Sequence, residues 1–115
     1  RALRRAKRGI RIIGVQPDAP FHGLEGMKHL ESSIVPGIYD PASLDQTEFV
    51  STEEGWAMRD RLAQLEGLLV GHSSGASAVA ALRVARELRE GVVVCVFCDH
   101  ADRYVERKTP RKPAP

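Results

Sequence analysis

The chain has 115 residues and a mass of 12.6 kDa, a size that permits a single small hydrophobic core. Hydrophobic residues make up 43 % of it and charged residues 28 %, which is ordinary for a globular chain and excludes disordered and collagen-like classes. The net charge of +2 is uneven, because residues 1–11 hold six basic residues and residues 103–115 hold five. No aromatic residues alternate with these charges, so we interpret them as solvated ends and expect no nucleic-acid partner.

Membrane, disulfide and metal sites are not indicated. No apolar run reaches the roughly 18 residues of a membrane span, and no apolar signal region follows the basic N-terminus. We therefore expect a cytoplasmic protein without membrane contact. Two cysteines exclude a disulfide framework, and the four histidines lack ligand spacing, so we expect no metal.

Helical patterns and short apolar segments alternate from the N-terminus onwards. Residues 2–8 predict a helix that ends at Gly9, and the β-branched residues after it predict a strand over residues 10–16. Residues 17–50 sustain no periodicity, apart from a short strand expected at residues 48–50. Loops of this length in compact domains are usually functional.

The second half of the chain shows clearer elements. Thr52 is expected to cap a helix over residues 52–64. The apolar residues 67–71 predict a strand, and a helix over residues 76–89 follows it. The continuous apolar run at residues 92–97 is typical of a strand buried on both faces of a parallel sheet. This order predicts an α/β fold, a short parallel sheet with flanking helices.

Residues 71–75 read Gly-His-Ser-Ser-Gly and open the last of these helices; we call them the GHSSG turn. The sequence fits G-x-S-x-G, the nucleophile elbow of α/β-hydrolases, with Ser73 as the nucleophile. A hydroxyl at a helix N-terminus can instead hold a polar ligand atom beside free backbone N–H groups, or simply cap the helix. A hydrolase needs an acid and a separate histidine after the serine. Asp99 and His100 are adjacent, and no oxyanion loop precedes the turn, so the pattern disfavours a hydrolase.

Cys95 and Cys98 form a C-x-x-C pair, which is also found in redox and zinc sites. Residues three apart in a strand point to opposite faces, so the two sulfur atoms diverge if residues 92–97 form a strand. We therefore interpret them as buried, inert thiols.

Five segments together resemble the pyridoxal 5′-phosphate (PLP) dependent cysteine synthases and cystathionine β-synthases, enzymes of the tryptophan-synthase-β fold type. They are residues 13–17 (IGVQP), 23–30 (GLEGMKHL), 34–40 (IVPGIYD), 66–76 (EGLLVGHSSGA) and 99–104 (DHADRY). Their order and spacing carry the resemblance. It implies that residues 1–105 are the C-terminal part of the PLP-binding domain of a larger fold-type-II enzyme. Residues 106–115 are then a basic, proline-containing tail, expected to be disordered.

The resemblance implies that Ser73 bonds the pyridine nitrogen of PLP and that Gly71, Ser74 and Gly75 shape the turn around the ring. A neutral hydroxyl there favours β-elimination and β-replacement over transamination. The implied enzyme makes L-cysteine from an activated serine, O-acetylserine or O-phosphoserine, and sulfide. Cystathionine β-synthase activity and a non-catalytic binding domain are the alternatives.

Residues 23–30 correspond to the family's active-site entrance, and we call them the entrance segment. The resemblance makes its Gly26, Met27, Lys28 and His29 possible substrate contacts. Lys28 could face the phosphate of O-phosphoserine or be merely solvent-exposed.

Two positions near the cofactor depart from the family pattern. His72 stands where an apolar or small residue is usual; it is either a spectator pointing into a sheet interface or a proton-relay group near the cofactor. Asp99 lies in a turn that usually reads Pro-Asp-Ser-Gly, which leaves its part near the cofactor open.

The family's Schiff-base lysine, substrate-carboxylate loop and phosphate loop lie in its N-terminal half, and none of their motifs occurs here. The resemblance therefore implies no catalytic residue in this chain, which alone should be inactive. Its expected partners are the N-terminal half of the same enzyme and, in a homodimer, a second copy.

Overall fold

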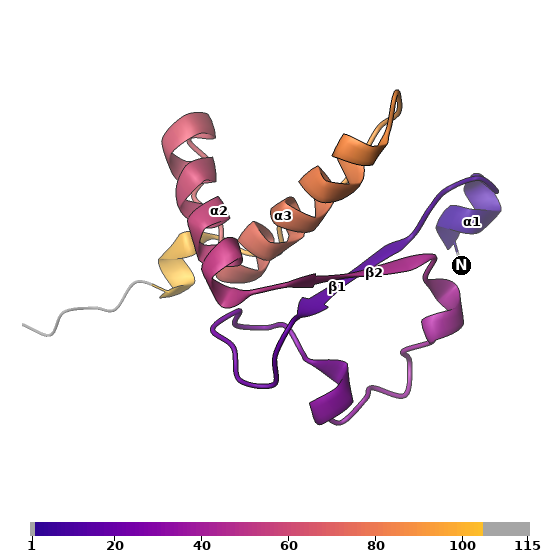
Figure 1. The fold of residues 1–115 in the computed structure, drawn as a ribbon, viewed down its shortest axis with the longest axis horizontal. Coiled ribbons are helices and arrows are strands. Elements are labelled where there is room, and N and C mark those ends of the chain that lie inside the picture. The colour runs from indigo at the N-terminus through magenta and orange to yellow at the C-terminus, as the bar shows by residue number, and fades with distance from the viewer. Residues whose placement is uncertain (1, 105–115) are drawn as a thin grey trace, which may run out of the picture.

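The computed structural model describes residues 2–104 (Figure 1); the predicted tail at residues 106–115 lies outside them. The helices and strands follow in the order α1 (Ala2–Ala6), β1 (Ile13–Pro17), β2 (Gln46–Val50), α2 (Thr52–Glu66) and α3 (His72–Glu87). Three 3₁₀ turns complete the order: η1 (Leu30–Ser32), η2 (Pro41–Ser43) and η3 (Ala101–Tyr104).

The strands β1 and β2 form a two-stranded parallel sheet, in which Ile13 lies opposite Gln46 and Pro17 opposite Val50. Helices α2 and α3 extend from the carboxyl end of β2 and diverge from each other (Figure 1). The predicted α/β fold with a short parallel sheet and flanking helices is confirmed. Strand β1 begins later than predicted, and β2 begins earlier.

Local signals define α2. Ser51 is its N-cap, not Thr52 as predicted: its hydroxyl accepts from the Glu54 amide at 3.2 Å, and the Glu54 carboxylate accepts from the Ser51 amide at 3.1 Å. This capping box satisfies two amides that the helix leaves free. Gly67 ends the helix with φ +68°, a left-handed conformation that favours glycine.

Two helix boundaries differ slightly from the prediction. Helix α1 ends at Ala6, before the expected stop at Gly9. Helix α3 begins at His72, with Gly71 as its N-cap, and ends at Glu87.

Two predicted strands are absent from the described residues. Residues 67–71 begin with the cap of α2, and only Val70 pairs, in a single antiparallel bridge with His100. Residues 92–97 form no ladder, and Val92 and Val94 are 89 % and 84 % exposed. A strand needs neighbours to bond and layers to cover it, and residues 2–104 supply neither here. Cys95 and Cys98 are both exposed, so their interpretation as buried thiols in a strand was also wrong.

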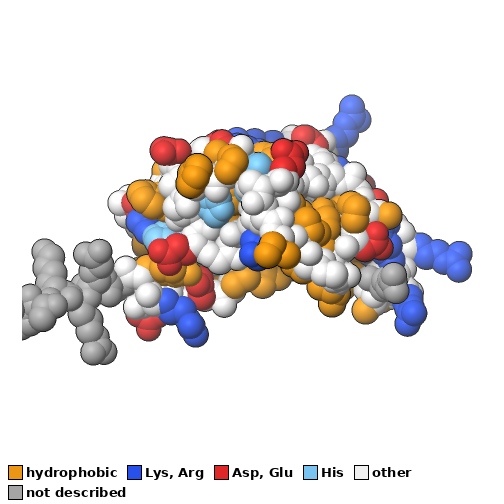
Figure 2. All heavy atoms as spheres, turned by 90° about the horizontal axis from the view of Figure 1, so that it is seen from below, with side chains coloured by type: hydrophobic (Ala, Val, Ile, Leu, Met, Phe, Trp, Pro, Cys, Tyr) orange, Lys and Arg blue, Asp and Glu red, His pale blue; other side chains and the backbone are white. Residues whose placement is uncertain are grey.

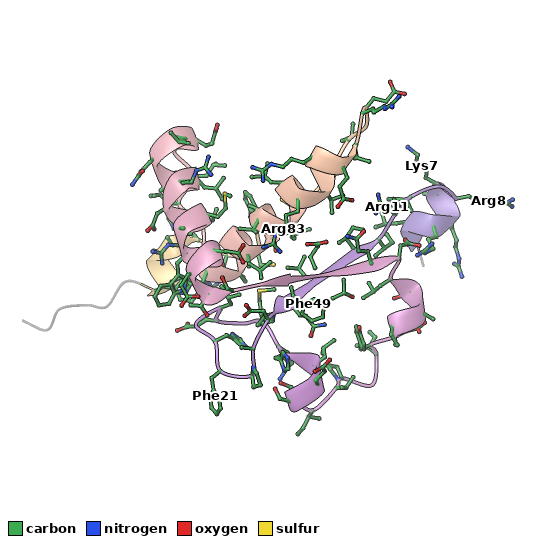
Figure 3. The ribbon with its side chains drawn as sticks, in the orientation of Figure 1. Lys7, Arg8, Arg11, Phe21, Phe49 and Arg83 are labelled. Atoms are coloured by element: carbon green, nitrogen blue, oxygen red, sulfur yellow. The ribbon has the colours of Figure 1, made fainter. Side chains whose placement is uncertain are left out.

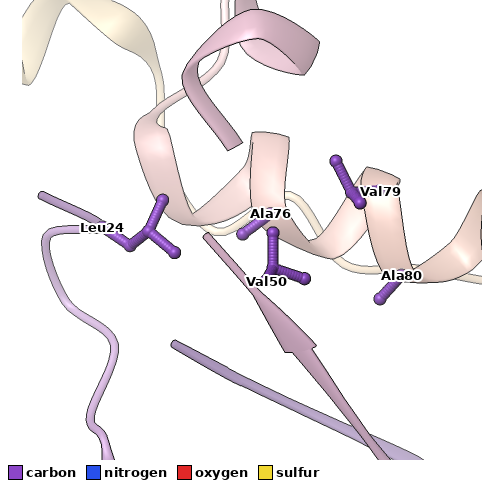
Figure 4. Close-up of a cluster of buried hydrophobic side chains, with 5 residues drawn as sticks. All are labelled: Leu24, Val50, Ala76, Val79 and Ala80. Carbon is purple, nitrogen blue, oxygen red and sulfur yellow. The ribbon is translucent and has the colours of Figure 1, made fainter. Parts of the chain in front are cut away.

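The hydrophobic core joins the entrance segment, the end of β2 and one face of α3 (Figure 4). Its members are Leu24, Val50, Ala76, Val79 and Ala80. Figure 2 shows further hydrophobic side chains at the surface between charged ones. Phe21, which is 98 % exposed, points away from the molecule (Figure 3). None of the helices within residues 2–104 has the length and apolar character needed to cross a membrane.

Candidate functional site

The GHSSG turn places Ser73 in the first turn of α3, where the side chain is half-buried. The first amides of a helix have no partner within it, and the helix dipole makes this end positive. Gly71, the N-cap, has no side chain to bond them. A hydroxyl beside free amides can hold a polar atom of a ligand, and this role of Ser73 stays a prediction.

Unpartnered polar atoms gather at this turn. In residues 2–104, the buried side-chain nitrogen and oxygen atoms without a hydrogen-bond partner are His72 Nδ1, Ser74 Oγ and Asp99 Oδ1. Ser74 is completely buried. An unsatisfied buried polar group costs about 1–3 kcal/mol, so a polar group bound here would recover free energy. This donor and acceptor set fits a polar heterocycle such as the pyridine ring of PLP.

Gly71 is required by the segment that covers it. A Cβ atom at this position would lie 2.0 Å from Asp99 Oδ1 and 2.7 Å from Tyr104 Cε2. The Gly71 amide donates to the Asp99 carbonyl at 3.2 Å. The structure thus brings Asp99 against the turn; its part near the cofactor stays a prediction.

Gly75 has a different neighbour. A Cβ atom there would lie 2.1 Å from the carbonyl oxygen of Gly55 in α2. The contact between α2 and α3 therefore explains this glycine without a ligand. Sequence reasoning missed Gly55, because no local pattern indicates where two helices cross.

The segment after residue 98 braces the turn. Ala101 donates its amide to the Leu69 carbonyl at 3.2 Å, beside the bridge between Val70 and His100. The Tyr104 hydroxyl donates to the Asp99 carboxylate. This hydrogen bond, with smaller contributions from burial and from the charge of Asp99, raises the pKa of Tyr104 to about 12.

His72 lies beside two aromatic rings, those of Trp56 and Tyr104; its part as a spectator or as a proton-relay group stays a prediction. Its ring centroid is 4.5 Å from that of Tyr104 and 5.5 Å from that of Trp56, both tilted. These separations are typical of favourable aromatic pairs. Trp56, which the sequence analysis did not single out, is therefore part of the site's surroundings.

The entrance segment is held by its own contacts. Met27 packs against the core, and Gly26 has φ +83°. His29 is 8 % exposed, and its Nδ1 lies 2.8 Å from Ser32 Oγ, which gives it a structural contact. Lys28 is exposed. Among the four predicted entrance residues, Lys28 therefore presents a charged side chain to solvent.

Other chemistry is not assembled in the described part of the chain. Lys7 and Lys28, its two lysines, are both exposed. No group of three or more His, Cys, Asp or Glu side chains in residues 2–104 could hold a metal ion. His100 pairs with Asp102 at 3.1 Å on the surface, which gives a hydrolase at Ser73 no support.

Comparison with known proteins matches residues 1–99 to the family model described as "Pyridoxal-phosphate dependent enzyme". The chain is 49 % identical over 100 residues to a cysteine synthase of Aquifex aeolicus, an alignment that covers 84 % of this chain and 31 % of the relative. The chain thus spans about a third of the length of the curated relatives it resembles.

Solved structures agree. A cysteine synthase of Entamoeba histolytica matches with a TM-score of 0.84 and 25 % identity, over 98 % of this chain and 36 % of that one. An O-acetylserine dependent cystathionine β-synthase of Helicobacter pylori matches with a TM-score of 0.80 and 38 % identity, over 90 % of this chain and 36 % of that one. The chain belongs to the family of pyridoxal-phosphate-dependent enzymes of fold type II.

Proposed function

We propose that this chain is the C-terminal part of a PLP-dependent enzyme that makes L-cysteine from an activated serine and sulfide. The observation that carries the proposal is the half-buried hydroxyl of Ser73 in the first turn of α3, in a chain 49 % identical to a cysteine synthase. Cystathionine β-synthase activity is the second candidate, because an O-acetylserine dependent enzyme of that name is among the structural neighbours.

Ser73 would hold the pyridine nitrogen of the cofactor, whose ring supplies the electron sink for elimination at the β-carbon. A hydroxyl is neutral and stabilises the unprotonated nitrogen, whereas a carboxylate would favour its protonation. The free amides of the first turn of α3 add a positive potential beside it. Ser74 in this turn and Asp99 beside it contribute buried oxygen atoms without a hydrogen-bond partner.

The Schiff-base lysine and the phosphate loop would come from the N-terminal part of the enzyme, which this chain does not span. Val92, Val94 and Val96 are 89 %, 84 % and 69 % exposed, and Val93 between them is 38 % exposed, so residues 92–96 are an apolar segment that residues 2–104 leave uncovered. We propose that this segment pairs with strands of that N-terminal part. From the resemblance we carry over a homodimer and a cytoplasmic location.

The test uses the complete enzyme with Ser73→Ala and Ser73→Asp. We expect both variants to retain the cofactor. Cysteine formation should be about tenfold slower in Ser73→Ala, because the hydrogen bond is lost, and slower still in Ser73→Asp, because of its carboxylate. Ser77→Ala, a half-buried serine of the same helix, is the matched control and should change the rate less than about twofold.

Three outcomes would reject the proposal in different ways. Full activity of both Ser73 variants would remove Ser73 from the site. Product formed only with homocysteine would favour cystathionine synthesis. Labelling of Ser73 by a fluorophosphonate would favour a hydrolase.

Lys28 provides a test of the activated serine. Lys28 is exposed and stands in the sequence between Met27 and His29, whose contacts hold the entrance segment. Its ammonium group would pair with the phosphate of O-phosphoserine. Lys28→Ala should then lower kcat/KM for O-phosphoserine, relative to that for O-acetylserine, by about tenfold. Lys7→Ala, which removes an exposed cation from the residue after α1, should leave this ratio unchanged. An unchanged ratio in Lys28→Ala would assign Lys28 to solvent.

A further inference from the structure

We propose that His72 is a positioning residue, which fixes the entrance segment relative to the GHSSG turn through its ring contacts with Trp56 and Tyr104. The entrance segment belongs to the loop after β1, and the turn begins α3. Contacts between these two regions decide how a substrate channel is held. The inference rests on the proposed function for the meaning of the entrance, but its contacts are independent of the reaction.

The first link joins Trp56 to the entrance segment. The indole Nε1 donates to the carbonyl oxygen of Gly23 at 3.1 Å, and the Gly23 amide donates to Thr52 Oγ1 at 2.8 Å. A Cβ atom at Gly23 would lie 2.6 Å from Trp56 Cζ2. The start of the entrance segment therefore lies directly on the indole ring and on the first turn of α2.

The second link joins Trp56 to His72. Their ring centroids are 5.5 Å apart with an interplanar angle of 38°. His72 is the first residue of α3 and precedes Ser73 in the chain. A displacement of the indole would therefore shift the ring of His72, the first residue of α3.

The third link joins His72 to Tyr104. The Tyr104 ring lies 4.5 Å away at an angle of 37°, and its hydroxyl donates to Asp99. The carbonyl of Asp99 accepts from Gly71, the residue before His72. The imidazole thus contacts an indole that is bonded to the entrance segment and a phenol that is bonded to Asp99, the residue that accepts from Gly71.

An apolar or small side chain at this position would remove the ring that both the indole and the phenol contact. Each aromatic pair contributes about 0.5–1.5 kcal/mol beyond its buried area, which corresponds to an approximately two- to tenfold change in an opening equilibrium. The effect should appear in the entrance segment, residues 23–30, which lies far from His72 in the sequence.

The experiment measures hydrogen–deuterium exchange of the complete enzyme without substrate, for the wild type, His72→Leu and His72→Phe. We expect exchange of residues 23–30 to rise about two- to tenfold in His72→Leu and to stay at the wild-type level in His72→Phe, which keeps an aromatic ring. Exchange of residues 80–87, in the last turns of α3, is the internal control and should not change. In the same variants, KM for the amino-acid substrate should rise more in His72→Leu than kcat falls.

Unchanged exchange of residues 23–30 in His72→Leu would overturn the proposal. An equal rise in His72→Phe, or a rise over all of α2 and α3, would also overturn it, because the effect would then be general destabilisation. If His72→Leu does not fold, the same exchange measurement on Tyr104→Leu replaces it, since this variant removes a ring that His72 contacts. Unchanged exchange of residues 23–30 in Tyr104→Leu would then overturn the proposal. Failure of the proposed function would instead appear as absent cysteine formation with the exchange pattern intact.

Discussion

The backbones of α2 and α3 approach so closely at Gly55 and Gly75 that a Cβ atom on Gly75 would lie 2.1 Å from the Gly55 carbonyl oxygen. A Cβ atom on Gly55 would in turn meet Leu24 Cδ2 at 2.5 Å. Two glycines thus let the helices cross over the core. The GHSSG turn depends on this crossing, because it is the first turn of α3.

Gly75→Ala should destabilise the protein by about 1–3 kcal/mol, because the added methyl group meets backbone atoms that cannot move alone. Urea unfolding of the enzyme without cofactor measures this directly. Gly37→Ala is the matched control, since nothing lies within 4 Å of a Cβ atom there. Equal stability of both variants would show that the helices can separate at no cost.

Glu54 should contribute stability that depends on pH. Its hydrogen bond from the Ser51 amide, followed by that from Arg83, lowers the pKa of its carboxyl group. A depressed pKa in the folded state means that the stabilisation is present above the ordinary pKa of about 4.3. It is lost as the pH falls through the lower folded value.

Glu54→Gln should therefore unfold at lower urea concentration than the wild type at pH 7, with a loss of about 1 kcal/mol typical of a helix cap. The difference should shrink below about pH 4. Glu53→Gln removes the same charge from an exposed residue of the same turn and serves as the control. A difference that persists undiminished in acid would contradict the assignment to the ionised carboxylate.

Arg83 connects the capping box of α2 to α3 and to β2. Its guanidinium group donates to the Phe49 carbonyl at 2.7 Å and to Glu54 at 2.5 Å, so it joins α3 to the end of β2 and to the start of α2. Figure 3 shows Arg83 and Phe49 on these neighbouring elements.

Elements with local signals were predictable from the sequence. Helices α2 and α3 lie where the sequence predicted helices, α3 with a long run of alanine and valine, although Ser51 and not Thr52 caps α2 and Gly67 ends it. The predicted strands at residues 67–71 and 92–97 were wrong for the opposite reason. A strand depends on partners distant in sequence, and the apolar pattern does not show whether they are present.

The candidate site was predictable only in part. The motif and the resemblance indicated the GHSSG turn and Asp99, and the structure places these two side by side. The hydrogen bond from Trp56 to Gly23 joins residues 33 positions apart, and no periodic pattern in the sequence indicates such a contact. Aromatic residues contribute only 5 % of the chain, so Trp56 could have been noticed as a single large side chain, but its neighbours follow from tertiary packing.

Leu24 should be the most sensitive side chain of the entrance segment. It is completely buried and joins this segment to the core, so Leu24→Ala should cost about 2–5 kcal/mol by leaving a cavity. Leu65→Ala, at a leucine of α2 that is 69 % exposed, is the control and should cost less than about 1 kcal/mol. Urea unfolding of both variants measures the contrast, and equal losses would contradict the position of Leu24 in the core.

Asp99 should control the ionisation of Tyr104. The hydrogen bond to the Asp99 carboxylate raises the pKa of Tyr104 to about 12, so Asp99→Asn should return it toward the ordinary value of about 10. A raised folded pKa means that the stabilisation is complete below about pH 10 and disappears as the pH rises through 12. The stability difference between the wild type and Asp99→Asn should therefore shrink in alkali.

Ultraviolet absorbance of the phenolate measures this titration, with Tyr104→Phe subtracted to isolate one tyrosine. Asp102→Asn is the control, because that carboxylate lies two residues before Tyr104 and contacts His100 instead. If Asp99→Asn and the wild type titrate together, the hydroxyl does not donate to Asp99. Asp99 would then contact the turn only through its carbonyl oxygen, which accepts from the Gly71 amide, and would not hold the Tyr104 ring beside His72.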